Sequence, residues 1–497
     1  MTPTIVRMYR ASPLARTLGG FIILAFVLLL FADVEISTVD PWTEFGRLLL
    51  GILTPDFTAT ENILNAILYT IAFALLGVTF AVIFGFALAL VFQNPLVRGF
   101  CATIRAVHEL FWALIFLQIF GLSPLTGILA IGIPYAGIVA KVFAEILEEA
   151  DTRAVAATPS GTGALSMMLF VRLPDVWAHY RTYALYRLEC GLRSSAILGF
   201  VGLPTLGFHL ETAFRQGNYS EVSALLLIFY VIIATQRLWA RRQLLPIYLI
   251  GAVVILPWSV QISMANITRF FVVDIVPFPL RNGEGFEGLM DWLGLLLANQ
   301  ALPGTVATIQ LTMIALVATG LLAALFFPLI SPLMIGRTGR SVGHVALVVI
   351  RSTPEYILAF VLLQLWGPSM LPAIVALALH NGGIIGHLVG RYTETITLRS
   401  DAPRGIARYG FEILPRVYNS LLALLFYRWE VIMRETAILG ILGIATLGFY
   451  VDSAFAELRF DRAVFLIGIT ALLNIVIDMI SRRIRTSLRL RTALEGR

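Results

Sequence analysis

The sequence predicts an all-α, polytopic membrane protein with about twelve transmembrane helices. Of its 497 residues, 58% are hydrophobic and only 13% are charged, whereas soluble globular chains have about 45–50% apolar and about 25% charged residues. Roughly 288 apolar residues are present, enough for on the order of twelve spans of about 20 residues each. The length leaves little room for a soluble domain, so a large cytosolic enzyme fused to the membrane part is excluded.

The net charge of +6 is interpreted as a sign of membrane orientation. The basic residues form short clusters between apolar runs, as in the cytoplasmic loops of membrane proteins, and not the continuous stripe that binds nucleic acid. The two cysteines, Cys101 and Cys190, have neither metal-ligand spacing nor a disulfide pattern. We therefore expect no nucleic-acid partner, and no metal or cofactor bound by this chain.

The arginines place both termini on the cytoplasmic side. Arg7, Arg10 and Arg16 precede an apolar run at 18–31, interpreted as an uncleaved helix because no small-residue cleavage site follows. The acidic segment 32–61 is expected outside, and the tail from 482 to 497, with six arginines, inside. The other spans are expected at 62–92, 106–120, 125–147, 178–203, 221–238, 245–262, 303–333, 345–366, 371–390, 418–445 and 462–480.

The chain is an internal duplication of two transmembrane repeats, 1–243 and 244–497. The segment YRLECGLRSSAILGFVGLPTLGF at 186–208 matches YRWEVIMRETAILGILGIATLGF at 427–449 in 13 of 23 positions, with a constant offset of 241. Upstream the offset is 246, so the second repeat has lost five residues in an inner loop. Six spans in each half give both repeats the same orientation, which is typical of transporters with a path between their halves.

The inner loop of the first repeat has the pattern A-A-x3-G-x9-V-x-L-P. Its residues are Ala156, Ala157, Gly161, Leu173 and Pro174. This spacing resembles the E-A-A loop of ABC transporter permeases. The resemblance implies a short helix, a turn at glycine and a second segment that stops at proline, which on the inner side would dock into a nucleotide-binding subunit and transmit its closure. The second loop is less regular, because of the five lost residues, and its candidates are Gly405, Leu414 and Pro415.

Charged pairs occupy equivalent positions on the two matching helices. The translocation-path candidates are Tyr186, Glu189, Arg193, Tyr427, Glu430 and Arg434. Each Glu precedes its Arg by four residues, so the pair shares one helix face in the favourable order. One interpretation is that the arginines line the path and bind an anion. The other is that each Glu holds its Arg and braces the helices, and the tyrosines share both interpretations.

Six repeated glycines interrupt the apolar stretches that follow these pairs. They are Gly199, Gly202, Gly207, Gly440, Gly443 and Gly448. Interrupted helices at matching positions indicate a transport path, whereas small residues also permit close helix packing. Both interpretations stay open.

Two further repeated features receive structural interpretations. The charged side chains of Arg105/Glu109 and Arg351/Glu355 are expected to snorkel to the inner membrane interface. The outer stretches 41–53 and 287–298, each with a tryptophan, are expected as amphipathic helices lying on the outer surface.

Together these features resemble the phosphonate-type permease family of ABC importers, with two repeats fused in one chain. The most specific part is Y-R-x-E-x3-R-x2-A-x-L-G-x2-G-x4-G, present at 186–207 and again at 427–448. The chain departs from the family's usual His-Thr-x-Gly, reading PYAG at 134–137 and HNGG at 380–383. Val155 also stands where the inner loop of ABC permeases usually has Glu.

The resemblance implies a duplicated type I ABC importer permease fold in a bacterial inner membrane. It implies import of a phosphonate or a related phosphorus oxyanion, such as phosphite or phosphate. The implied partners are two copies of a cytoplasmic ATPase, which bind ATP and Mg²⁺, a periplasmic binding protein and membrane lipid. The sequence contains no G-x-x-x-x-G-K-[ST] loop, so the chain itself is expected not to be an enzyme. The alternatives are an ion-coupled secondary transporter, an ABC permease for another small solute, or a membrane scaffold.

Overall fold

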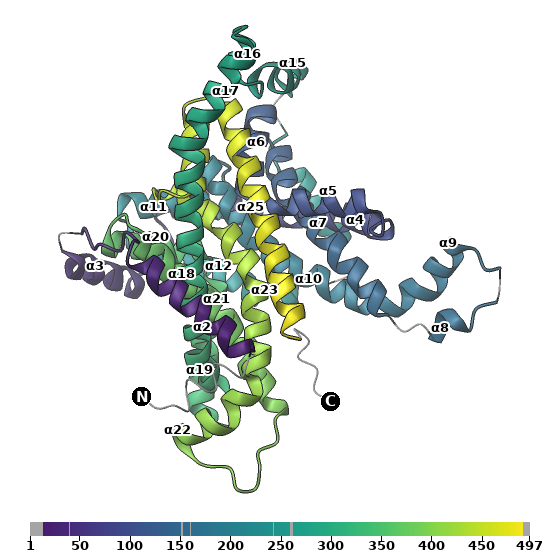
Figure 1. Ribbon diagram of the computed structural model, residues 1–497, viewed down its shortest axis with the longest axis vertical. Helices are drawn as coiled ribbons and strands as arrows, with labels where there is room; N and C mark the ends of the chain where they lie inside the picture. The colour runs from purple at the N-terminus through teal and green to yellow at the C-terminus, as the bar shows by residue number, and fades with distance from the viewer. Residues whose placement is uncertain are drawn as a thin grey trace. The chain divides into compact units, whose positions relative to one another are not determined.

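A computed structural model describes residues 13–38, 40–150, 153–159, 161–241, 243–258 and 262–490. All regular elements in these ranges are helices (Figure 1), as predicted for an all-α membrane protein. Within them, five helices are long and apolar enough to cross a membrane, or up to eight if each of three bent pairs is one span. Arg7, Arg10, Arg491 and Arg497, which entered the prediction of orientation, lie outside the described residues.

The chain folds as two compact units, which do not coincide with the two halves of the sequence. One unit comprises Arg47–Val276, and the other comprises Met1–Gly46 together with Pro277–Arg497. Helix α2 (Pro13–Leu29) therefore packs on α18 (Leu302–Phe326), in the unit built mostly from the second half. Conversely, α14 (Leu245–Ile255) packs on α4 (Ile63–Leu90). Each repeat's first helix thus belongs to the body formed by the other repeat.

The unit at Arg47–Val276 is organised around α4 and α7, which pack along each other. Two glycines of α4 permit this approach, because a Cβ at Gly77 would lie 2.9 Å from Ile131 and one at Gly85 would lie 2.7 Å from Val139. The helices other than α4 and α14 are α3 (Pro41–Leu53, begun in the other unit), α5 (Pro95–Ala106), α6 (Glu109–Phe120), α7 (Pro124–Glu149), α8 (Arg153–Ala156), α9 (Ala164–Met167), α10 (Leu173–Ile197), α11 (Leu206–Gln216), α12 (Tyr219–Ala234), α13 (Gln236–Trp239) and α15 (Met264–Arg269).

The second unit repeats this plan, with α18 packed along α21. Its helices other than α2 and α18 are α16 (Phe278–Arg281), α17 (Gly285–Leu296), α19 (Arg337–Ser352), α20 (Glu355–Trp366), α21 (Met370–Tyr392), α22 (Gly405–Arg408), α23 (Leu414–Ile441), α24 (Leu447–Ala456) and α25 (Phe460–Ser487). One hydrogen bond shows the repetition directly. Thr70 accepts the backbone N–H of Leu206 at 2.9 Å, and Thr308 accepts that of Leu447 at 2.9 Å.

The structure corrects the expected element boundaries at two places. The stretch 287–298 is not a separate surface helix, because a π-helical turn joins α17 and α18 into one apolar span, Gly285–Ile330. The expected spans at 106–120 and 345–366 are broken elements. The α5–α6 pair bends by 89° and the α19–α20 pair by 92°. His108 caps α6 by accepting the N–H of Leu110. Pro354 precedes α20 and favours the end of α19, because proline holds the residue before it, Thr353, in an extended conformation.

Candidate functional site

Glycine permits the turn between the last two helices of each matching segment. Gly202 has φ +85° and Gly443 has φ +88°, a left-handed conformation that costs a residue with a Cβ about 1–2 kcal/mol. In the first repeat the helical segments on either side, Met168–Val201 and Leu206–Gln216, bend by 56°. The predicted interruptions therefore exist in the backbone at these two positions.

The other four repeated glycines permit close packing of the backbone. A Cβ at Gly199 would overlap the backbone of Phe208, and one at Gly207 would overlap the carbonyl of Ala196. Gly440 and Gly448 meet the equivalent backbone of α24 and α23. The interpretation as helix breaks thus fits Gly202 and Gly443, and the interpretation as close packing fits the other four glycines. The part that any of them plays in transport stays a prediction.

The predicted path residues occupy similar environments in the two repeats. Tyr186 and Tyr427 are 44% and 43% exposed, and the Glu and Arg of each pair are half-buried. Arg193 donates to the sulfur of Cys190 at 3.5 Å, and the guanidinium of Arg485 lies 5.4 Å from the ring centre of Tyr427. Because these side chains are neither sealed in the core nor fully solvated, contact with a substrate and a bracing role both remain predictions.

A buried polar cluster that the sequence did not predict lies beside these residues in the first unit. Ser194 of α10 donates to the carboxylate of Glu109 on α6 at 2.7 Å, and the Tyr135 hydroxyl of α7 lies 2.8 Å from the Ser194 hydroxyl. Arg187 lies 5.3 Å from the ring centre of Tyr135 and donates to the hydroxyl of Tyr183 at 2.7 Å. Three helices are therefore joined through one set of polar side chains.

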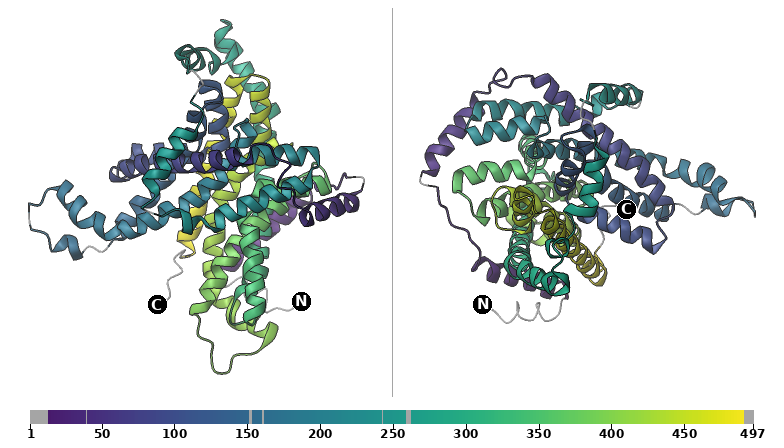
Figure 2. Two further views of the ribbon diagram at one scale, coloured as in Figure 1. Left: turned by 180° about the vertical axis from the view of Figure 1, so that it is seen from behind. Right: turned by 90° about the horizontal axis from the view of Figure 1, so that it is seen from above.

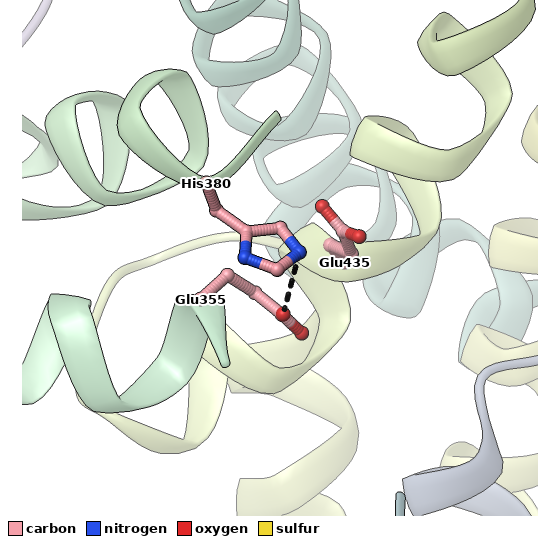
Figure 3. Close-up of side chains that lie close together, drawn as sticks. All are labelled: Glu355, His380 and Glu435. Carbon is pink, nitrogen blue, oxygen red and sulfur yellow. Dashed lines mark ion pairs between the residues drawn. The ribbon is translucent and has the colours of Figure 1, made fainter. Parts of the chain in front are cut away.

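The second unit contains the equivalent cluster, with different chemistry. Glu355 of α20, His380 of α21 and Glu435 of α23 point toward one another (Figure 3). Asn381 donates to Glu435 at 2.8 Å, and Arg428 donates to the side-chain oxygen of Asn381 at 3.2 Å. At offsets of 246 and 241, this cluster replaces a proline, a tyrosine and a serine of the first repeat with His380, Asn381 and Glu435.

The clusters correct one interpretation and reveal a signal in the sequence that was overlooked. Glu109 and Glu355 are each 8% exposed, and Arg105 is also 8% exposed. They do not snorkel to an interface, because the sharp bends before α6 and α20 turn them into the protein.

Arg187 and Arg428 are the second residue of the matched segment in both repeats. They precede Ser194 and Glu435 by seven residues, two helical turns, and this spacing predicts one shared face.

The first inner loop, 148–174, connects the end of α7 to the start of α10 (Figure 2). Ala156 ends α8, Ala157 is exposed, and Gly161 has φ +101°. A π-helical turn at Met168–Arg172 follows α9, and Leu173 and Pro174 then begin α10. The expected succession of short helix, glycine turn and second helix is therefore present in the described residues.

The second inner loop, 397–416, keeps the later part of this arrangement. Gly405 has φ +64° and begins α22, and a π-helical turn at Tyr409–Ile413 precedes Leu414 and Pro415 at the start of α23. The offset of 241 therefore extends back to the π turns, and the five lost residues fall before them. The hydrogen bond from the Arg399 guanidinium lowers the pKa of the Asp401 carboxyl, and the two exposed side chains form an ion pair on this loop.

An exposed phenylalanine stands at the same place in both π turns. Phe170 is 78% exposed and Phe411 is 81% exposed, and the two are 241 residues apart. Because both repeats expose a large apolar side chain at this position, it is a candidate contact with a docked subunit. The sequence analysis missed both residues, although extending the constant offset upstream from the matched segment would have found them.

The duplicated membrane fold, the repeated broken helices and the two loops define a transport permease. Comparison with characterised proteins supports this class. The chain is 26% identical to the phosphate-import permease protein PhnE of Mycolicibacterium smegmatis, over 92% of this chain and 91% of that protein. It is 31% identical to the phosphite transport system permease protein PtxC of Stutzerimonas stutzeri, over 43% of this chain and 84% of that protein. The latter relative thus corresponds to about one repeat.

The chain belongs to the phosphonate-type family of ABC import permeases. It is a transport subunit of the inner membrane and crosses it several times. No family model matches the sequence, and no match was found among solved structures. The identification therefore rests on these relatives and on the repeated features described above.

Proposed function

We propose that this chain imports a phosphorus oxyanion, phosphite, phosphate or a phosphonate, through a path built from its two repeats. The similarity over nearly the whole chain to a phosphate-import permease carries the proposal, together with the similarity of one repeat to a phosphite permease. We place six spans in each repeat, twelve in all, with both termini in the cytoplasm. A periplasmic binding protein delivers the anion on the opposite side.

The basic side chains of the matched helices suit an anionic substrate. Guanidinium groups bind the oxygens of phosphorus oxyanions through paired, charge-assisted hydrogen bonds. Arg193 and Arg434 are half-buried at equivalent positions, each on the same helix as an exposed tyrosine. In the proposal they line the path, while Arg187 and Arg428, which are also half-buried, hold the polar clusters that shape it.

The two inner loops are proposed as the docking sites for two copies of a separate ATPase. Each loop presents a glycine in a left-handed conformation, a π turn and an exposed phenylalanine before a rigid helix that runs into the membrane. Because α10 and α23 also carry the path candidates, movement of a docked loop is transmitted directly to them. ATP and Mg²⁺ bind to that ATPase subunit and not to this chain.

A growth experiment tests the substrate class. A bacterial strain without its own phosphate, phosphite and phosphonate importers is given this chain with the ATPase and binding protein of the same system. We expect growth on at least one phosphorus oxyanion as the sole phosphorus source. We expect none in Gly161→Pro, because proline cannot adopt φ +101° and the substitution distorts the first loop. Growth that needs only this chain, without the ATPase, would instead identify a secondary transporter.

A further inference from the structure

The buried cluster of the second unit has the composition of a metal site. Glu355, His380 and Glu435 each offer one ligand atom, and these atoms lie within 4.8 Å of one another (Figure 3). All three side chains are buried, with exposed fractions of 8%, 2% and 8%. They come from α20, α21 and α23, so one ion would join three helices.

The imidazole is held in the orientation that a metal ligand requires. His380 Nδ1 lies 2.8 Å from the carbonyl oxygen of Thr353, and because a carbonyl can only accept, Nδ1 carries the proton. This leaves Nε2 facing the cluster, 3.8 Å from an oxygen of Glu355. Metal-binding histidines characteristically donate their other N–H to a carbonyl or carboxylate in this way.

One separation between ligand atoms is close to that expected around a bound ion. Zinc binds nitrogen and carboxylate oxygen at about 2.0–2.2 Å, so two tetrahedral ligands lie about 3.4 Å apart. The separation of His380 Nε2 and Glu355 is within half an ångström of that value. Outer partners are present too, because Glu435 accepts a hydrogen bond from Asn381, which accepts one from Arg428.

The first repeat provides an internal comparison that favours a cation. There the position of Glu435 is occupied by Ser194, whose hydroxyl donates to Glu109, and the position of His380 is occupied by Pro134. That cluster is joined by hydroxyl hydrogen bonds and has one carboxylate. The second repeat places two buried carboxylates together, an arrangement that is unfavourable when both are ionised unless a proton or a cation lies between them.

We propose that Glu355, His380 and Glu435 bind one first-row divalent cation, of the Zn²⁺ or Mn²⁺ class, in the second repeat only. One imidazole with two carboxylates suits these ions better than Mg²⁺, which prefers oxygen ligands alone. The bound ion fixes the bend before α20 against α21 and against α23, the helix that carries Tyr427, Glu430 and Arg434. The three ligands are 25 and 55 residues apart, a spacing without any motif, which is why the sequence predicted no metal.

Metal retention by the full chain in detergent tests the proposal. The protein is stripped with a chelator, incubated with Zn²⁺ or Mn²⁺, dialysed and analysed by elemental mass spectrometry. We expect an equimolar amount of one of these ions and its loss in Glu435→Ser, which copies the first repeat. Removing a ligand should weaken binding at least as much as removing an outer partner, about 10- to 100-fold. Glu109→Gln, at the equivalent first-repeat position, should leave retention unchanged.

The same experiment separates a metal site from a cluster that holds only protons. Negligible retention of both ions by the wild-type chain overturns the proposal, as does equal retention by wild type and Glu435→Ser. If Glu435→Ser does not purify as a monodisperse protein, Glu355→Gln replaces it under the same criteria. Cobalt substitution adds a spectroscopic readout, because Co²⁺ in a nitrogen and oxygen site gives visible absorption that the variants should lose.

Discussion

The exposed phenylalanines of the inner loops yield the most quantitative prediction. Complete burial of a phenylalanine side chain contributes about 1.5–3 kcal/mol. Phe170 is 78% exposed and Phe411 is 81% exposed. If ATPase docking buries what is now exposed, each side chain contributes about 1.2–2.4 kcal/mol to docking. That free energy corresponds to a change of about 7- to 60-fold in the dissociation constant of the ATPase for each loop.

The test compares single and double alanine variants with the wild-type chain. We expect Phe170→Ala and Phe411→Ala each to weaken binding of the ATPase at its own loop, measured by surface-immobilised binding or by co-purification, and the double variant to weaken binding at both loops. The thermal midpoint of the isolated chain should change little, because exposed side chains contribute little to folding stability.

A matched control is available on the predicted outer side. Phe286 of α17 is 73% exposed, so Phe286→Ala removes a similar apolar surface without touching either inner loop. Wild-type ATPase affinity in both loop variants, or an equal loss in the control, would refute the assignment of these loops. A loss in one loop variant alone would show that the contracted second loop docks differently.

Three further predictions concern the glycine turn at Gly202, the repeated threonine hydrogen bond at Thr308, and the path candidates Arg193 and Arg434. Gly202→Ala should destabilise the chain by about 1–2 kcal/mol because φ is +85° there. The control Gly468→Ala should not destabilise it, because a Cβ at that position meets nothing within 4 Å. Thermal unfolding in detergent measures both effects. Thr308→Val should cost about 1–3 kcal/mol, since it removes the acceptor of a buried backbone N–H, and an unchanged thermal midpoint would contradict this. Arg193→Gln and Arg434→Gln should lower the rate of anion uptake about 10- to 150-fold, the loss of one charge-assisted hydrogen bond each, while ATPase binding stays normal. A lower thermal midpoint with normal uptake by the folded fraction would favour the bracing role.

The sequence predicted what depends on composition and repetition. The apolar content predicted the helical membrane class. The constant offset of 241 placed Gly202 and Gly443 at equivalent positions, and their φ values in the structure are similar, +85° and +88°. Hydropathy could not reveal the bends before Glu109 and Glu355, because an apolar run looks the same whether a helix is straight or broken. It therefore misplaced both glutamates at an interface.

Tertiary pairing was equally hidden from the sequence. The packing of α2 on α18 and of α14 on α4 follows from complementary surfaces that no spacing rule describes. The offsets alone place His380 and Glu435 at the positions of Pro134 and Ser194. Only the fold shows that these two side chains meet Glu355, which comes from a third helix. Arg187 was within reach of sequence reasoning, since it is identical in both repeats and lies two helical turns before Ser194.

Reconstituted transport tests the central claim most directly. The chain is placed in liposomes with the ATPase and the binding protein of its system, and uptake of radiolabelled phosphate, phosphite and a phosphonate is followed with ATP supplied on the ATPase side. The account predicts accumulation of at least one of these anions that requires ATP hydrolysis and persists when an uncoupler collapses the proton gradient. Uptake that proceeds without ATP and stops with the uncoupler would contradict it.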